Sequence, residues 1–217
     1  MKKQNKKQLY MALAFLAIFL FWTFLLRMVD VEPIGPEGTK VGFAALNGAV
    51  HDLTGVHWML YTVTDWMGLI PVGICFGFAI LGLRQLIVRK SLFRVDRDIL
   101  ALGGFYILVF AAYLLFEEVA LNYRPVLVEG RLEASYPSST TLLALCVLPT
   151  AQWQLRRRIR SVSRRKAVEV LLIGLTAFLV VGRLLSGVHW LSDIVGAVLL
   201  SAGLDALYMW AATDRSF

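Results

Sequence analysis

The sequence predicts an all-α fold: a polytopic membrane protein built as a bundle of six transmembrane helices. The chain of 217 residues is 58% hydrophobic, whereas soluble domains are typically about 45–50% apolar. Several mostly apolar runs reach about eighteen residues or more, which is long enough to cross about 30 Å of hydrocarbon as a helix. The positive charges gather in short segments between these runs.

Hydropathy gives six spans in chain order. The first follows the basic start MKKQNKKQ, and we expect it to be retained because its apolar core is too long for a signal peptide and no small-residue cleavage site follows. The second can begin earlier than its hydropathy suggests, because GVHWMLYTVTDW carries aromatic residues suited to the headgroup region. The fourth opens on hydroxyl residues that favour a helix N-cap. The predicted spans are 10–28, 62–88, 98–121, 139–155, 167–185 and 190–210.

The segment between the first two spans, DVEPIGPEGTKVGFAALNG, is expected to be a loop because it is rich in proline and glycine. No internal repeat or low-complexity linker divides the chain. We therefore expect residues 1–217 to form a single integral membrane domain.

The basic residues predict the orientation in the membrane. Of the 22 lysines and arginines, 17 fall in the N-terminal segment, the loops at 84–97 and 156–166, and the C-terminal tail, which six spans place on one side. Cytoplasmic loops carry an excess of such residues, so both termini are expected in the cytoplasm of a multi-pass cell-membrane protein. The basic excess is thus explained by the orientation of the chain in the lipid bilayer. Nucleic acid is not expected as a partner, because no aromatic platform accompanies the basic loop RRRIRSVSRRK.

The segment GRLLSGVHWLSDIVG carries a cation, an imidazole and a carboxylate in an apolar context, which makes each a functional candidate. His189 and Asp193 are four residues apart and would share one face of a helix. The carboxylate could then accept the Nδ1 proton and leave Nε2 as a nucleophile. The SGV turn would let Arg183 come back towards the imidazole. A purely structural His–Asp pair at a helix start is the alternative.

Two further clusters meet this one at the outer ends of the spans. Arg124 lies in NYRPV after the third span, and Ser138, Ser139 and Thr140 open the fourth. Arginine side chains and free N–H groups at a helix N-terminus bind anions. A nucleophilic imidazole facing them predicts a phosphoryl-transfer site on the outer face.

The same residues carry a family resemblance. RLLSGVHWLSD resembles the third signature of the type 2 phosphatidic acid phosphatase and vanadium haloperoxidase superfamily, RP at 124–125 its first and YPSST at 136–140 its second. The resemblance runs from about 98 to 210, with the signatures within 117–193. It implies a membrane lipid phosphatase in which His189 becomes a phosphohistidine and Asp193 orients it. Arg124, Arg183 and the amides near 138–140 would hold the phosphoryl oxygens, with no metal and no organic cofactor.

The sequence departs from the family pattern at three positions. Glu117 stands where the first signature has lysine, and Gly182 where the third has serine. Thr140 replaces the histidine that protonates the leaving group, and a hydroxyl has no pKa useful for that work. Glu117, Glu118 and His57 are the candidate replacement donors, although the glutamates could equally end a helix in solvent or pair with an arginine.

Two functions are therefore expected from the sequence. In the first, the protein hydrolyses a lipid phosphate or diphosphate whose leaving group needs little protonation. A phosphate leaving group, with a second pKa of about 6, departs more easily than an alkoxide, which resembles hydroxide with a parent acid of pKa about 15.7. A polyprenyl diphosphate would fit. In the alternative, the protein binds, senses or flips a phosphorylated lipid without efficient turnover.

Overall fold

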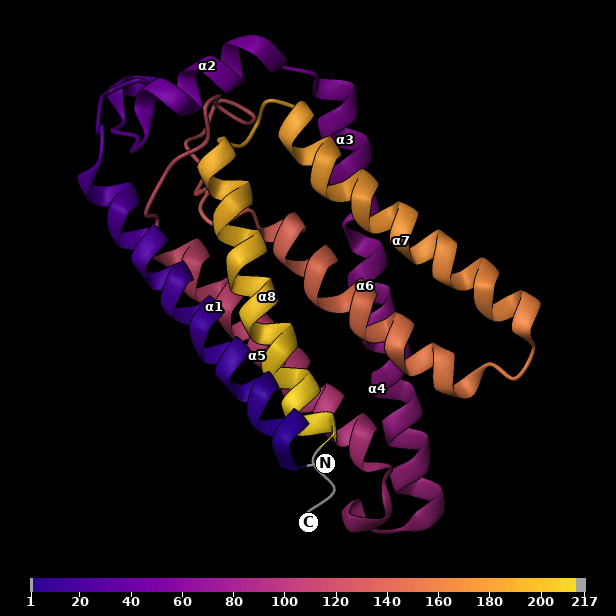
Figure 1. Ribbon diagram of the computed structural model, residues 1–217. Helices are drawn as coiled ribbons and strands as arrows, with labels where there is room; N and C mark the ends of the chain where they lie inside the picture. Colours follow the sequence, from indigo (N-terminus) through magenta and orange to yellow (C-terminus); the bar gives the residue numbers. More distant parts are fainter. Residues whose placement is uncertain (1, 214–217) are drawn as a thin grey trace.

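The computed structural model describes residues 2–213, and within this range it contains eight α-helices, two short 3-10 turns and three isolated β-bridges (Figure 1). The prediction of an all-α fold is confirmed. Side chains are described for 6–212. The predicted cytoplasmic position of the Lys2, Lys3 and Arg215 side chains therefore lies outside the described residues. The helices are α1 (Lys2–Met28), α2 (Ala44–Thr54), α3 (Trp58–Met67), α4 (Leu69–Arg89), α5 (Arg97–Glu118), α6 (Ser139–Arg158), α7 (Val162–Leu185) and α8 (Leu191–Thr213).

Five helical segments of the described chain are long and apolar enough to cross a membrane. Four of them are mostly exposed to the surroundings of the bundle, as lipid-facing helices are, and the fifth, Leu191–Ala212, is half buried. The protein is therefore a multi-pass membrane protein. The five segments are Lys6–Met28, Trp58–Arg89, Arg97–Glu118, Val162–Leu185 and Leu191–Ala212.

Helix α6 is the remaining predicted span and is not among these five. It packs against α4, α5, α7 and α8, and 11 of its 20 residues are buried. A helix shielded from lipid by its neighbours can carry polar side chains that bond within the bundle. The hydroxyl of Thr150 donates to the Cys146 carbonyl, and Nε2 of Gln154 donates to the Tyr208 hydroxyl at 2.7 Å. Internal partners therefore compensate for the lower hydropathy of this helix.

Helices α1 and α8 run side by side along the bundle, and α1 begins at the end where α8 finishes (Figure 1). Phe19 of α1 contributes to the core, and its ring stacks on Tyr136 at a centroid distance of 6.2 Å. The Tyr136 hydroxyl shares a hydrogen bond of 2.7 Å with Thr23. Burial raises the pKa of that phenol. These contacts fix the segment before α6 against α1.

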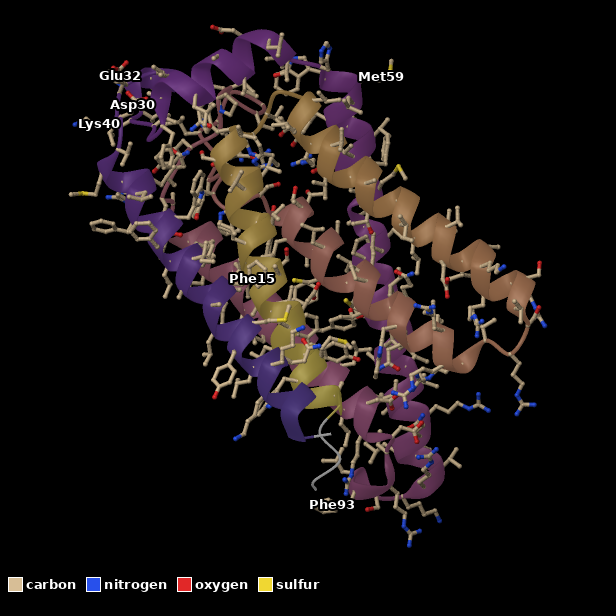
Figure 2. All side chains as sticks on the ribbon, viewed as in Figure 1. Phe15, Asp30, Glu32, Lys40, Met59 and Phe93 are labelled. Carbon is tan, nitrogen blue, oxygen red and sulfur yellow. The ribbon has the colours of Figure 1, made fainter. Side chains whose placement is uncertain are left out.

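The short connections α4–α5 and α6–α7 carry the basic loops. Phe93 lies at the end of the bundle that holds the α4–α5 connection, and Met59 lies at the opposite end (Figure 2). Arg89 bonds Asp96 at 2.7 Å, and Arg158 pairs with Asp98 at 3.1 Å. The hydrogen bond from Arg89 lowers the pKa of the Asp96 carboxyl. These pairs join the helix ends where the positive charge gathers.

The expected loop between the first two spans is only partly irregular, which corrects the sequence-based expectation. Helix α2 begins at Ala44 and lies across one end of the bundle (Figure 1). The Asp30 carboxylate accepts the Ala45 N–H at 2.8 Å, and buried Asn47 exchanges two hydrogen bonds with Ser192 of α8. The Asp30 side chain thus caps an N–H in the first turn of α2, and the Asn47 side chain caps the Ser192 N–H in the first turn of α8. These bonds allow a helix to form after a glycine-rich segment.

The second span begins at Trp58 rather than 62 and is divided at Gly68 into α3 and α4. A Cβ at Gly68 would lie 3.2 Å from the Thr140 methyl carbon, so this glycine lets α3 approach the start of α6 closely. The third span ends at Glu118 rather than 121, since Val119 leaves the helical conformation with a ψ of 76°. Beyond it, the Asn122 carbonyl accepts the Ser135 N–H at 2.9 Å.

Candidate active site

A tight turn at 186–190 joins α7 to α8 and carries His189. Gly187 adopts a φ of +69°, which glycine accommodates without steric cost. The Ser186 hydroxyl donates to the Arg183 carbonyl at 2.7 Å. The turn reverses the chain, so that Arg183 at the end of α7 meets the imidazole that precedes α8.

Two guanidinium groups converge on Nε2 of His189. The Nη2 atom of Arg183 lies 3.2 Å from it and Nη1 of Arg124 lies 3.4 Å from it. A guanidinium can only donate, so Nε2 accepts and the ring proton is on Nδ1. Burial, followed by the charges of Arg124 and Arg183, lowers the pKa of His189 well below its usual 6.5. The imidazole is therefore neutral at pH 7 and has a lone pair on Nε2.

Asp193 lies in the first turn of α8 and is fully buried. Its Oδ2 accepts the Trp190 N–H at 2.9 Å, and its Oδ1 accepts from Asn122 at 3.2 Å. The distance from Oδ2 to His189 Nδ1 is 3.7 Å, which is longer than a hydrogen bond. The carboxylate is therefore on the Nδ1 side of the ring and is held there by other donors. Its orienting role stays a prediction.

Arg124 comes from the segment between α5 and α6, which folds back on itself through a bridge between Tyr123 and Ala134. The Arg124 N–H donates to the Glu133 carbonyl at 3.1 Å, and the guanidinium Nε lies 3.0 Å from the Glu133 carboxylate. The Trp190 indole donates to the Tyr123 carbonyl at 2.8 Å. This segment is thereby fixed to the turn that carries His189.

Two residues of α3 also belong to the cluster, although sequence reasoning did not place them there. Asp65 lies 3.4 Å from Nη1 of Arg183. The ring of Tyr61 lies under both guanidinium groups, with centroid distances of 4.9 Å to Arg183 and 5.9 Å to Arg124. The four-residue spacing of Tyr61 and Asp65, which places both on one helix face, was the available signal.

The start of α6 reaches the same region. The Ser138 N–H donates to the Asp193 carbonyl at 3.2 Å, and its hydroxyl donates to Thr141 at 3.0 Å. Leu142 makes the first helical bond back to Ser138, so the three preceding amides, those of 139–141, are unused within α6. The Thr140 methyl group faces Gly68 of the neighbouring segment.

Among the described residues, the side chains of the three candidate proton donors form no hydrogen bond or ion pair with Arg124, Arg183 or His189. Glu117 and Ser139 line a small pocket of their own. Within the described part of the chain, neither Glu117 nor Glu118 forms a hydrogen bond or an ion pair. The ring Nε2 of His57 lies 2.9 Å from the Thr54 carbonyl. The structure does not bring any of these side chains into contact with His189.

The cluster retains unused capacity to bind an anion. Arg183 is 1% exposed, and its Nε is buried without a hydrogen-bond partner. Buried donors in proteins are nearly always satisfied, so this guanidinium nitrogen is a donor available to an acceptor that enters the cluster. With Arg124 and Nε2 of His189 beside it, the arrangement brings anion-binding groups next to a neutral imidazole that could act as a nucleophile.

Residues 2–217 match the family model of the PAP2 superfamily. The chain belongs to the PAP2 superfamily. This confirms the resemblance carried by the three signatures. Among solved structures, the PAP2 chain resembles the crystal structure of the first transmembrane PAP2 type phosphatidylglycerolphosphate phosphatase from Bacillus subtilis. The identity is 17%, the match covers 96% of this chain and 100% of that one, and the TM-score is 0.66, which shows a shared fold. None of the curated proteins compared matches this PAP2 chain.

Proposed function

We propose that this PAP2 protein hydrolyses a phosphorylated lipid through a covalent phosphohistidine on His189. The observation that carries the proposal is the buried Nε2 of His189 between the guanidinium groups of Arg183 and Arg124. A neutral imidazole can attack phosphorus, and the two arginines would stabilise the charge that develops on the phosphoryl oxygens. The name of the Bacillus subtilis neighbour, a phosphatidylglycerolphosphate phosphatase, supports a lipid substrate.

The remaining predicted residues take supporting roles in this proposal. The carboxylate of Asp193, 3.7 Å from Nδ1, would offset the positive charge of the phosphorylated ring. The free amides of 139–141 would bind phosphoryl oxygens at the N-terminus of α6. Residues 1–217 would act as one domain.

The site would face the outside of the cell. The basic connections at 84–97 and 156–166 join helices at the end of the bundle opposite α2 and the candidate site (Figure 1). Basic loops favour the cytoplasmic side of the membrane. This supports the proposal that both termini lie in the cytoplasm and that the His189 cluster lies at the outer interface, where lipid headgroups would reach it.

The substrate would be a diphosphate such as a polyprenyl diphosphate. Thr140 cannot protonate a leaving group, and general acid help is typically worth about 10²–10⁴ in rate. A lipid alkoxide needs that help, whereas a departing phosphate, with a second pKa of about 6, needs little. The missing acid thus favours cleavage between two phosphates.

An apolar groove between α4 and α5 supports a long hydrocarbon chain. It has a volume of about 850 Å³ and runs along α5 from Ile99 to Leu114, a length of about 22 Å at 1.5 Å per residue. Its lining includes Val72, one helical turn from Gly68, whose neighbour is Thr140. A chain in this groove would begin near the candidate site and cross most of the hydrocarbon layer.

A phosphate-release panel on the purified protein in lipid tests the proposal. We expect faster phosphate release from polyprenyl diphosphate than from phosphatidate, and we expect His189→Ala to abolish both. Faster turnover of phosphatidate would refute the diphosphate preference. Unchanged release by His189→Ala would refute the phosphohistidine.

A binding, sensing or flipping protein is the second candidate, and a specific observation favours it. Asp65 and Glu133 already pair with the two arginines, and the acid position is occupied by threonine. Both features would slow turnover. A phosphorylated lipid that copurifies and persists, with no phosphate release over hours, would support this candidate against the phosphatase.

A further inference from the structure

Asp65 is connected to the proposed nucleophile through a single guanidinium group. Its Oδ1 lies 3.4 Å from Nη1 of Arg183, while Nη2 of the same group lies 3.2 Å from Nε2 of His189. The guanidinium is planar and rigid, so it fixes the carboxylate and the imidazole relative to each other. A phosphoryl group on His189 that bonds to Arg183 would therefore lie close to Asp65.

Asp65 also lies beside the position where the family histidine is missing. The N–H of Gly68 donates to the Asp65 carbonyl at 3.0 Å, and the Thr140 methyl group packs against Gly68. Gly68, three residues after Asp65, thus joins the end of α3 to the position of Thr140. A titratable group is therefore carried by a helix end that adjoins the position from which one has been lost.

Water can reach this carboxylate. The side chain of Asp65 is 54% exposed, and it lines an open groove between α3 and the segment before α6. Tyr61 and Glu129 line the same groove. His189 is 3% exposed, so a water molecule that attacks its phosphoryl group would approach from a more open side such as this one.

We propose that Asp65 is the general base for the second half of the reaction, an inference that rests on the proposed phosphohistidine. The carboxylate takes a proton from water as the water oxygen bonds to phosphorus. The bond between phosphorus and Nε2 of His189 breaks, and its electron pair returns to Nε2. Inorganic phosphate leaves, and Asp65 then releases its proton to solvent.

The role of base fits an ion-paired carboxylate better than the role of acid. The Asp65 carboxylate faces Arg183 as a hydrogen-bond acceptor, and a general base likewise works by accepting a proton. The first step needs no acid when the leaving group is a phosphate. The second step needs a base because neutral water is a weak nucleophile. Asp65 would thus supply the base for the second step, which a diphosphate substrate still requires. The acid for the first step, which such a substrate does not need, would remain absent.

Rapid-quench measurements with a polyprenyl diphosphate radiolabelled on its terminal phosphate test the inference. Asp65→Asn keeps an acceptor for Arg183 but cannot take a proton. We expect it to form the acid-labile phosphoprotein at nearly the rate of the unsubstituted protein, while phosphate release falls about 10²–10⁴-fold. The phosphoprotein should therefore accumulate. Asp65→Glu should recover part of the release, and Glu129→Gln, from the same groove, should leave both rates unchanged.

Each outcome separates the two proposals. Normal phosphate release by Asp65→Asn would overturn the role of Asp65 and leave the phosphohistidine standing. An equal loss of phosphoprotein formation and of release would show that Asp65 only positions Arg183, which also overturns the base. Absence of both phosphoprotein and free phosphate with the unsubstituted protein would overturn the proposed function itself.

Discussion

The backbone of Gly187 packs directly against the carbonyl of Gly55. A Cβ at Gly187 would lie 1.8 Å from the Gly55 oxygen, and the residue has a φ of +69°. Next to this contact, the His57 N–H donates to the Ser186 carbonyl at 3.0 Å. The connection between α2 and α3 therefore locks the turn that presents His189.

Gly187→Ala should displace the turn and with it the imidazole. Small misplacements of reacting groups cost about 10² in rate, so we expect phosphate release to fall at least that far and the unfolding temperature to drop. Gly38→Ala is the matched control, because Gly38 has a φ of +74° with open space around its Cα. It should lose only a little stability. A Gly187→Ala protein with normal turnover would contradict the locked turn.

Arg183→Lys should lower kcat by about 10²–10³, the usual cost of losing one donor to a transition state. Lysine is a point charge and cannot bond His189 and Asp65 through two rigidly spaced nitrogens. Steady-state kinetics on a lipid diphosphate would measure the effect. Arg157→Lys should keep full activity, because Arg157 stacks on Trp153 at 4.6 Å in the last turn of α6. Equal kcat for both variants would count against the arginine cradle.

The lowered pKa of His189 determines in which direction the stability of the fold changes with pH. Unfolded, the imidazole binds a proton as the pH falls through about 6.5, whereas the folded protein keeps it neutral. Its contribution to stability is therefore complete above about pH 6.5 and decreases below it. NMR of ring-labelled histidine, with His189→Ala to assign the signal, should find His189 titrating below pH 6.5. Titration at or above that value would contradict the buried, arginine-flanked environment.

Gly103→Leu should obstruct the groove between α4 and α5. Gly103 lines the groove and has no atom within 4 Å of an added Cβ. We expect a higher KM for a polyprenyl diphosphate and an unchanged KM for a soluble diphosphate that lacks the chain. Gly174→Leu on α7, which also has open space but lies outside the groove, is the control. Parallel changes with both substrates would exclude the groove as the binding place of the chain.

Much of this protein follows from local sequence. An apolar run of sufficient length must form a helix in lipid because backbone groups there have no other partners. Five of the six predicted spans are accordingly long and apolar enough to cross a membrane, with ends shifted by a few residues. The proximity of Arg183, His189 and Asp193 was also predictable from local sequence, because one turn separates the first two and one helical period the last two. The family followed from these signatures, and the match over residues 2–217 confirms it.

The tertiary structure decided what depends on contacts between distant segments. Asp65 meets Arg183 across 118 positions, and Asn47 meets Ser192 across 145. Hydropathy averages over neighbouring residues and carries no information on which helix ends meet. The sequence by itself therefore determined a membrane bundle and the identity of its nucleophile candidate. Only the packing of α3 against α7 decided that the Asp65 carboxylate meets Arg183.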